Sequence, residues 1–396
     1  MYPTHIPFNK PYLSGNETRY IEEAVRSGKI SGDGMFTKRC HRFFEQELGF
    51  KKVLLTTSCT DALEMAAMLL DIVPGDEVIM PSYTFVSTPN AFVLRGATIV
   101  FADSTALNPN MDPAQIEALI TPRTRAIVPV HYAGIACDLD PIMEIANRHN
   151  LFVIEDAAQA IDSFYKGRQL GTIGHLAAFS FHETKNIISG EGGMLAINDL
   201  RFFTRAEIIR EKGTNRSSFF RGEIDKYGWV DYGSSFLPSD IIAAFLWAQL
   251  ENMADIQSKR THIWERYYQA LSPLLAVGVQ LPAIPDYATN NGHMFYLVCR
   301  SLAERTALIE LMRTENVQPV FHYLSLHTSS FYADKHDGRP LPHSDHYTDC
   351  LLRLPLYYEL KDEDQDFVNQ LILGFYQDTQ KSPAVFPAAN LPVSGE

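Results

Sequence analysis

The stretch RAIVPVHYAGIACDLDPIMEIANRHNLFVIED (125–156) decides the fold. It contains two short, continuous apolar runs, at 125–132 and 151–156, with a helix-like segment at 140–150 between them. Continuous β-branched and aliphatic runs are typical of strands buried on both faces, and a helix between two such strands is typical of parallel pairing. The stretch therefore predicts a strand–helix–strand unit of a parallel sheet.

The same alternation extends in both directions, from residue 52 to about 200. Further strand-like runs lie at 52–58, 76–82, 97–103 and 177–182, and DALEMAAMLL (61–70) is typical of a helix. Strands that alternate with helices along the chain predict an α/β domain whose sheet is covered on both faces. In such sheets, ligands bind at the carboxyl ends of the strands, so those ends are where functional residues are expected.

The alternation stops after residue 200. Segment 211–236 is rich in charge and glycine and is interpreted as a loop, whereas 239–252 predicts a helix that is apolar nearly all round, buried in a core or at a subunit interface. Beyond it we expect a second domain with a helix at 257–273, a strand at 293–300, an amphipathic helix carrying Leu308, Leu311 and Met312, and a strand near 317–323. The predicted division is a large domain at 1–254, a small one at 255–376 and a mobile tail at 377–396.

Length, composition and charge exclude several classes of protein. The 396 residues are enough for two domains, and 46% of them are apolar, as in ordinary globular proteins. The net charge of −13 disfavours nucleic acid and anionic membranes as partners. No apolar run approaches the length of a membrane span, and MYPTHIPFNK (1–10) lacks the pattern of a signal peptide. Five scattered cysteines without a CxxC pair fit neither a disulfide framework nor a zinc site, so we expect a cytoplasmic protein without a metal.

Two predicted strand ends carry reactive side chains. LFVIED ends in Asp156, followed by Gln159, and AAFSFH (177–182) brings Ser180 and then Lys185 in front of the glycines of SGEGG (189–193). A lysine beyond a buried strand is well placed to form a Schiff base, and Asp156 could face a protonated ring nitrogen. Taken singly, a helix cap or ion pair for Asp156 and a solvated surface position for Lys185 are the more common interpretations.

Two further segments add a phosphate site and an aromatic ring. At Ser58-Cys59-Thr60-Asp61 a strand runs into a helix whose free amides could bind a phosphate, although ordinary capping explains the same residues equally well. Tyr83 and Phe85 follow the strand at 76–82 and could stack on a planar cofactor or simply fill a core. Together the four signals match pyridoxal 5′-phosphate (PLP) group by group. The absence of GxxxxGK and GxGxxG argues against a P-loop and against a nicotinamide dehydrogenase.

Three motifs together resemble one known family. EDAAQ (155–159), SFHETKN (180–186) and GEGG (190–193) are similar to those of the DegT/DnrJ/EryC1/StrS sugar aminotransferases, over residues 10 to about 375. The resemblance implies a fold of the aspartate-aminotransferase type (PLP fold type I). It also implies that Lys185 holds PLP as a Schiff base and shuttles protons, while Asp156 binds the pyridine nitrogen and Gln159 lies near the ring hydroxyl.

The resemblance assigns further roles around the cofactor and the substrate. It implies that Thr60, Asp61 and Ser180 bind the phosphate and that Phe85, rather than Tyr83, stacks on the ring. His322, Tyr323 and His327 would face the sugar nucleotide. Ser235 stands where many members have an asparagine that reaches the partner subunit's phosphate; serine is shorter, so the same contact would need a closer backbone or a bridging water.

The implied activity is transamination of a dTDP-linked keto sugar, with L-glutamate as amino donor, by a homodimer with shared sites. Residues 212–227 would cover the partner's site, with Lys212, Arg216 and Arg221 near the diphosphate, although interleaved Glu211, Glu223 and Asp225 fit a solvated loop equally well. Lys185 argues against a dehydratase, which has histidine there, and the chain has no basic helical module for a PLP-binding regulator. A lyase or decarboxylase on the same fold stays open.

Overall fold

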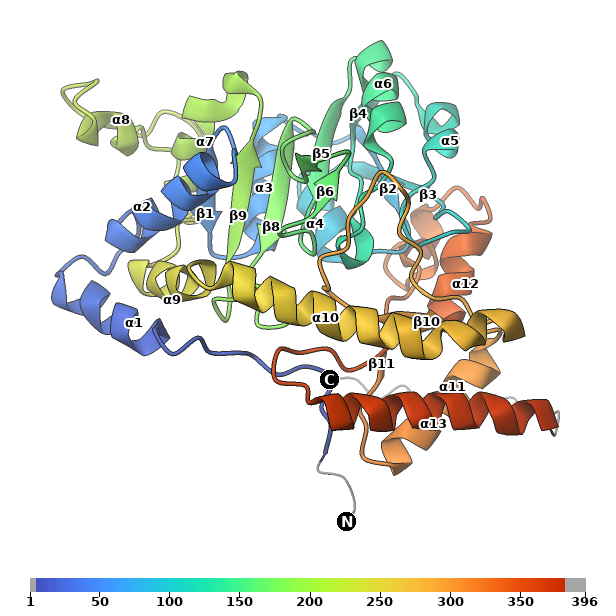
Figure 1. The fold of residues 1–396 in the computed structure, drawn as a ribbon. Helices are drawn as coiled ribbons and strands as arrows, with labels where there is room; N and C mark the ends of the chain where they lie inside the picture. Colours follow the sequence, from blue (N-terminus) through green and yellow to red (C-terminus); the bar gives the residue numbers. More distant parts are fainter. Residues whose placement is uncertain (1–4, 382–396) are drawn as a thin grey trace.

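A seven-stranded sheet forms the centre of the larger part of the molecule (Figure 1). The structure is a computed structural model and describes residues 5–381. The strands, in the order β1-β9-β8-β5-β4-β2-β3 across the sheet, are β1 Val53–Thr56, β9 Gly193–Ile197, β8 Leu176–Ser180, β5 Phe152–Asp156, β4 Thr124–Ile127, β2 Glu77–Pro81 and β3 Thr98–Ala102.

The sheet is mostly parallel, as predicted. β3, β2, β4, β5 and β8 pair in parallel, whereas β9 runs antiparallel to both β8 and β1. The prediction from sequence included six of these seven strands and missed β9, whose short run follows directly on the glycines of SGEGG. Side chains of β9 alternate between the faces, so Met194 and Ala196 enter one core while Leu195 and Ile197 enter the other.

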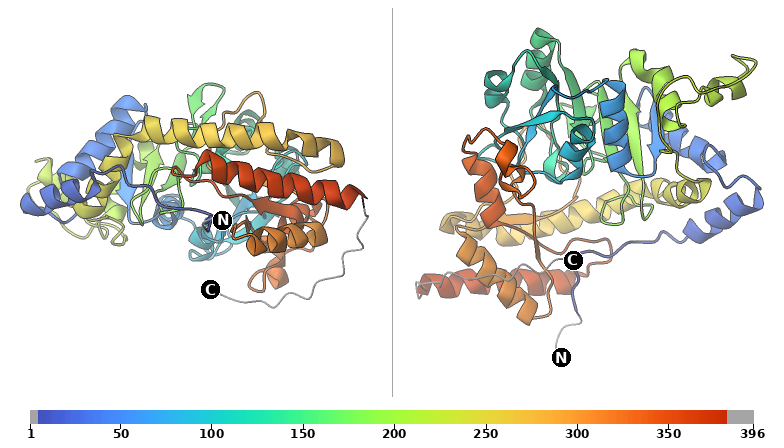
Figure 2. Two further views of the ribbon diagram at one scale, coloured as in Figure 1. Left: turned by 60° about the horizontal axis from the view of Figure 1, so that its bottom comes forward. Right: turned by 180° about the vertical axis from the view of Figure 1, so that it is seen from behind.

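Helices cover both faces of this sheet, which explains why its strands are apolar without alternation. One core contains α3, α4 and α7, which the rear view in Figure 2 brings forward, and the other contains α1, α2, α6 and α9. The helices of this larger part have the bounds α1 Glu17–Arg26, α2 Met35–Arg42, α3 Cys59–Leu69, α4 Ser87–Val93, α5 Pro113–Ile116, α6 Leu139–His149, α7 Phe203–Arg210 and α9 Asp240–Leu250. Among the described residues, no helix is long and apolar enough to cross a bilayer.

A smaller unit follows, built on the three-stranded antiparallel sheet β10-β12-β11. Its elements are α10 Met253–Leu271, β10 Tyr296–Val298, α11 Leu302–Thr314, β11 Val320–Phe321, α12 Pro342–Cys350, β12 Leu351–Arg353 and α13 Asp362–Lys381. Two segments cross the predicted boundary at 254/255. Ile6 packs in the core of the smaller unit, while Leu326, Tyr332 and Leu341 pack against the large sheet. The division into two domains therefore stays a prediction.

Two further expectations about local structure need correction. Segment 211–236 is not simply a loop: it contains α8 Arg216–Phe220 and two isolated bridges, Glu211 to Ser235 and Thr214 to Trp229. We call 211–236 the arm; its α8 projects from the molecule beyond α7 (Figure 1). The predicted tail at 377–396 begins too early, because α13 continues to Lys381. The rest of that tail lies outside the described residues.

Candidate active site

A cavity of about 950 Å³ lies at the carboxyl ends of the parallel strands, where the large sheet meets the smaller unit. Strands β5 and β8 end at it, α3 begins at it, and the segment around β11 together with β12 lines its other side. Most of the predicted site residues line this cavity: Thr60, Phe85, Asp156, Gln159, Ser180, Lys185, His322 and Tyr323.

Asp156 is the last residue of β5, and its carboxylate is buried. The hydroxyl of Thr88 donates to Oδ2 at 2.7 Å, and the amide of Ala158 donates to Oδ1 at 3.2 Å. Burial raises the pKa of this carboxyl, although these two donors and the charge of Lys185 oppose the rise. A positive group bound in the cavity would stabilise the charged form, so Asp156 is suited to a protonated ring nitrogen.

The neighbouring Glu155 points to the opposite face and anchors the strand from behind. Its Oε1 accepts the amides of Ile173 and Gly174, and its Oε2 accepts the amide of Gly171 and a hydrogen from His131 Nε2 at 3.0 Å. Burial alone would raise the pKa of Glu155, but the hydrogen bonds, led by that of His131, lower it.

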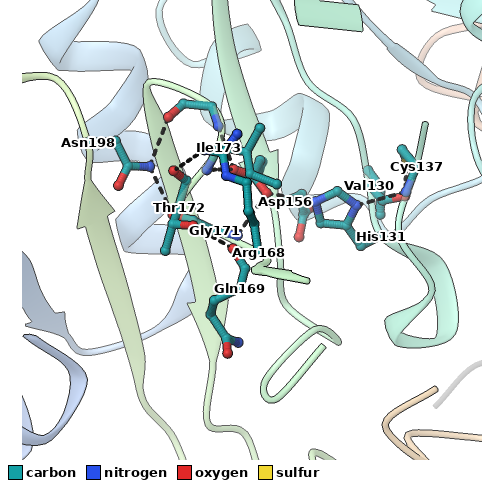
Figure 3. A network of polar contacts seen from close by, with 12 residues as sticks. Val130, His131, Cys137, Asp156, Arg168, Gln169, Gly171, Thr172, Ile173 and Asn198 are labelled. Carbon is teal, nitrogen blue, oxygen red and sulfur yellow. Dashed lines mark hydrogen bonds and ion pairs between the residues drawn. The ribbon is translucent and has the colours of Figure 1, made fainter. Parts of the chain in front are cut away.

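His131 and Asn198 complete this network around the end of β5 (Figure 3). Nδ1 of His131 accepts the amide of Cys137 at 3.1 Å, which requires the neutral tautomer with its proton on Nε2. The backbone amide of His131 donates to the carbonyl of Asp156 at 3.1 Å. On the far side, the amide of Asn198 donates to the carbonyls of Gly171 and Gly174. The network therefore fixes the backbone that carries Asp156.

Lys185 follows β8 in the turn 182–185, where its amide donates to the carbonyl of His182 at 2.9 Å. Its side chain lines the cavity. Burial lowers the pKa of the amine and the positive charge of Arg353 lowers it further, whereas the negative charge of Asp156 opposes this change. A lowered pKa raises the fraction of neutral amine, which is the form that attacks an aldehyde.

The start of α3 shows the capping interpretation, and the phosphate interpretation stays a prediction. Ser58 is the N-cap, since its Oγ accepts a hydrogen bond from the amide of Asp61 at 3.0 Å. The hydroxyl of Thr60 bonds to Ser87 Oγ at 2.8 Å. Ser58 and Thr60 line the cavity and Asp61 does not. The amide of Asp61 is therefore used by the cap, so its predicted role toward a phosphate needs that serine to move.

The two candidate aromatic residues lie in different surroundings, and the stacking role of Phe85 stays a prediction. Phe85 lines the cavity with 54% of its surface exposed, while Tyr83 is 1% exposed and does not line it. The ring of Tyr323 lies 5.9 Å from that of Phe85, and its hydroxyl accepts a hydrogen from Gln159 Nε2 at 3.2 Å. Oε1 of Gln159 accepts the amide of Ala133 at 2.6 Å, so this side chain is held from both ends.

Besides Asp61, five predicted residues do not line the cavity of their own chain. His327 is 6% exposed and its Nδ1 bonds to Ser82 Oγ at 2.8 Å, so nothing in these surroundings supports the prediction that it faces the sugar nucleotide. The other four, Ser235, Lys212, Arg216 and Arg221, belong to the arm. Arg221 pairs with Glu207 and Glu223, and Arg216 lies 3.8 Å from Glu211, as the solvated-loop interpretation expects.

Several residues of the cavity were not found from the sequence. Thr88 is the second residue of α4, three positions after Phe85, and no motif marks it. Arg260, His293 and Arg353 come from the smaller unit, far along the chain from the large sheet. Arg260 donates to the carbonyls of Gly292 and His293 at 3.1 and 2.8 Å. Arg353 was missed as well, although an arginine inside the apolar run LLRLPL (351–356) is a signal that could have marked it.

The comparisons with known proteins agree with this geometry. Residues 11–372 match the model of the DegT/DnrJ/EryC1/StrS aminotransferase family, and the chain belongs to this family. It is 33% identical over 376 residues to the spore coat polysaccharide biosynthesis protein SpsC of Bacillus subtilis, covering 93% of this chain and 96% of that protein.

Solved structures of similar proteins share the fold over almost the whole chain. The aminotransferase TlmJ from Streptoalloteichus hindustanus superposes with a TM-score of 0.85 at 28% identity, covering 96% of this chain and 100% of that one. DesV from S. venezuelae, solved with a ketimine intermediate, has a TM-score of 0.85 at 28% identity over 94% and 99%. The putative sugar aminotransferase Spr1654 from Streptococcus pneumoniae, in its PLP form, has a TM-score of 0.86 at 25% identity. The match covers 96% of this chain and 99% of that one.

The protein is therefore a PLP-dependent sugar aminotransferase of fold type I. The residues present fit the cofactor, because the buried carboxylate of Asp156, the amine of Lys185, the ring of Phe85 and the start of α3 all meet in one cavity. These are the partners that a pyridine nitrogen, an aldehyde, an aromatic ring and a phosphate require.

Proposed function

We propose that the protein converts dTDP-4-keto-6-deoxy-D-glucose to dTDP-4-amino-4,6-dideoxy-D-galactose, with L-glutamate as the amino donor. The observation that carries the reaction class is the meeting of Lys185 and Asp156 in one cavity, at the ends of β8 and β5. When bound there, PLP supplies an electron sink that makes a proton on the adjoining carbon labile.

The residues of this chain would divide the work as follows. Lys185 holds the cofactor through Nζ and then carries a proton from the α-carbon of the donor, and later returns one to the sugar carbon. Asp156 keeps the ring nitrogen protonated, because a negative charge in a buried site stabilises the positive partner. Phe85 and Gln159 hold the ring in orientation, and Ser180 and the start of α3 hold the phosphate.

The size of the cavity supports the proposal of a second, larger ligand beside the cofactor. The volume of about 950 Å³ is at the upper end of typical ligand pockets, so it has room for more than the cofactor. His322 and Tyr323 line the side away from the large sheet, where a sugar would be oriented by hydrogen bonds to hydroxyl groups. We further propose that Lys212, Arg216 and Arg221 of a second subunit contact the diphosphate.

The choice of sugar rests on resemblance. SGKISGDG (27–34), VPVHYAG (128–134), REKGTNRS (210–217), LWAQLE (246–251) and FHYLSLH (321–327) resemble the dTDP-4-amino-4,6-dideoxygalactose transaminase of enterobacterial common antigen synthesis. A 4-aminotransferase that gives the gluco epimer, or a 3-keto-sugar aminotransferase, would use the same cavity and the same catalytic residues.

Proton NMR of the product tests this choice. The purified protein is incubated with glutamate and dTDP-4-keto-6-deoxyglucose, and the couplings of H4 are measured. Small couplings are expected, because the new amine is axial in the galacto product. A large trans-diaxial coupling of H4 would mean the gluco epimer, and amination at C3 would overturn the substrate while leaving the PLP chemistry intact.

A further inference from the structure

Arg353 is a charged residue in a place that its strand does not explain. It lies on β12, the central strand of the small sheet, between Tyr296 of β10 and Val320 of β11, and it lines the cavity. Burying a guanidinium is costly unless it meets an anion or enough hydrogen-bond acceptors. A residue kept there against that cost is expected to have a ligand.

The surroundings of Arg353 supply no such partner. Its Nε is buried without a hydrogen bond, and within residues 5–381 no carboxylate forms an ion pair with it. The contact that it does make is with the ring of Phe8, whose centroid lies 4.5 Å from Cζ. Arg260, the second guanidinium of the cavity, differs because two of its nitrogens donate hydrogen bonds to backbone carbonyls. Arg353 therefore presents an unsatisfied, planar pair of donors to the cavity.

We propose that Arg353 binds a carboxylate of the amino donor; this inference rests on the proposed function. A guanidinium matches a carboxylate with two parallel hydrogen bonds, which a lysine cannot do. The donor is the substrate that must bring a carboxylate next to the reacting amine, since that group is attached to its α-carbon. Arg353 and Lys185 line the same cavity, so a donor whose amine reaches Lys185 can bring its carboxylate to Arg353.

The two other anions of the reaction fit this place less well. The phosphate of PLP is expected at the start of α3, which belongs to the opposite, large-sheet side of the cavity. The diphosphate of the sugar nucleotide is separated from the reacting carbon by the sugar ring. Between donor turnovers, Arg353 would face the neutral sugar, whose hydroxyl groups can accept the same hydrogen bonds more weakly.

Binding of glutarate tests the proposal without turnover. Glutarate has both carboxylates of glutamate and no amine that could react, and its binding to the PLP-loaded protein is followed by calorimetry, with dTDP as a second probe. In Arg353→Gln the dissociation constant for glutarate should rise about 10- to 100-fold, the range expected when a charged hydrogen-bond pair is lost. The dissociation constant for dTDP should stay unchanged. The dissociation constant of Arg353→Lys for glutarate should lie between those of Arg353→Gln and the wild type.

The control is Arg313→Gln, an exposed arginine in the last turn of α11 in the same unit, which should change neither constant. Retention of the visible PLP absorbance shows that Arg353→Gln keeps its fold and cofactor. Unchanged glutarate binding in Arg353→Gln, or a loss confined to dTDP, overturns the proposal. A wild-type protein that neither binds glutarate nor releases 2-oxoglutarate from glutamate would instead overturn glutamate as the donor in the proposed function.

Discussion

Glu155 and Asp156 are adjacent residues of one strand with different tasks, because successive side chains of a strand point to opposite faces. Asp156 faces the cavity, while Glu155 accepts four hydrogen bonds behind it. The sequence identified Asp156 through its place at a strand end. It gave no sign of the role of Glu155, because the partners lie in the segment 171–174 and at His131, which only the fold brings together.

We predict that Glu155→Gln destabilises the protein strongly. The amide nitrogen of glutamine cannot accept a hydrogen bond, so two of the four donors lose their acceptor whichever way the side chain is placed. The free energy of unfolding should fall by about 2–5 kcal/mol, measured by denaturant unfolding of the PLP-loaded protein. A loss below about 0.5 kcal/mol would contradict the anchoring role.

The same residue predicts a dependence of stability on pH. The pKa of Glu155 is lowered on folding, so its contribution is present above the unfolded value and is lost as the pH falls through the folded one. Wild-type melting temperature should therefore drop at pH values below about 4.5, and more steeply than in Glu155→Gln. Parallel curves for the two proteins would show that Glu155 titrates in the same way in both states.

Asp156→Asn should separate binding from chemistry. The change keeps the shape and removes the negative charge, so PLP should remain bound, while the ring nitrogen loses its proton. An ion pair at about 3 Å is worth about 5 kcal/mol at an effective dielectric near 20, before desolvation is subtracted. The single-turnover rate of the glutamate half-reaction should therefore fall by at least about 100-fold. A wild-type rate in Asp156→Asn would place the electron-sink role on another group.

At the scale of elements, strand β9 and helix α3 approach each other so closely that only glycine fits at position 193. A Cβ there would lie 2.3–2.4 Å from backbone atoms of Ser58 and Cys59 at the start of α3. The glycines of SGEGG therefore bring the segment after Lys185 against the predicted phosphate site.

Gly193→Ala should accordingly weaken PLP retention and cost about 1–3 kcal/mol of stability, measured by cofactor release on dialysis and by denaturant unfolding. Gly374→Ala is the matched control: this glycine lies within α13 with nothing within 4 Å of an added Cβ, so alanine should be neutral or slightly stabilising. Equal effects of the two changes would rule out the close contact as the cause.

Elements with a strong local pattern were predictable, and those defined by distant contacts were not. The apolar runs at 76–82, 97–103 and 151–156 identified β2, β3 and β5, because strands buried on both faces need no alternation. Strand β12 was missed since it is three residues long and acquires its structure by pairing with β10 and β11. Its Arg353 was missed as a site residue for the same reason.

At the scale of the whole molecule, the exposed apolar surface of the arm bears on the predicted second subunit, whereas α9 packs in the core of its own chain. Phe220, Tyr227, Trp229 and Val230 of the arm are exposed by 68%, 51%, 84% and 54%, which is a large apolar surface for a charged segment. Ser235, Lys212, Arg216 and Arg221 of the arm do not line the cavity of their own chain. Both facts fit the prediction of a homodimer in which each arm covers the partner's site.

Mixing two inactive variants tests this arrangement. Lys185→Ala lacks the catalytic amine, and Lys212→Ala combined with Arg216→Ala impairs the arm. After random exchange of equal amounts, about half of the dimers are hybrids with one intact site, so about a quarter of the wild-type activity should return. Confirmed subunit exchange without recovery of activity would contradict shared sites.

The central claim is that Lys185 and Asp156 operate one PLP in two half-reactions, and absorbance of the bound cofactor tests it most directly. On addition of glutamate to the purified protein, the visible absorbance should disappear with release of about one 2-oxoglutarate per site. After removal of glutamate, dTDP-4-keto-6-deoxyglucose should restore the absorbance, whereas Lys185→Ala should show neither change. Loss of the absorbance without 2-oxoglutarate, or no recovery with any keto-sugar nucleotide, would contradict the account.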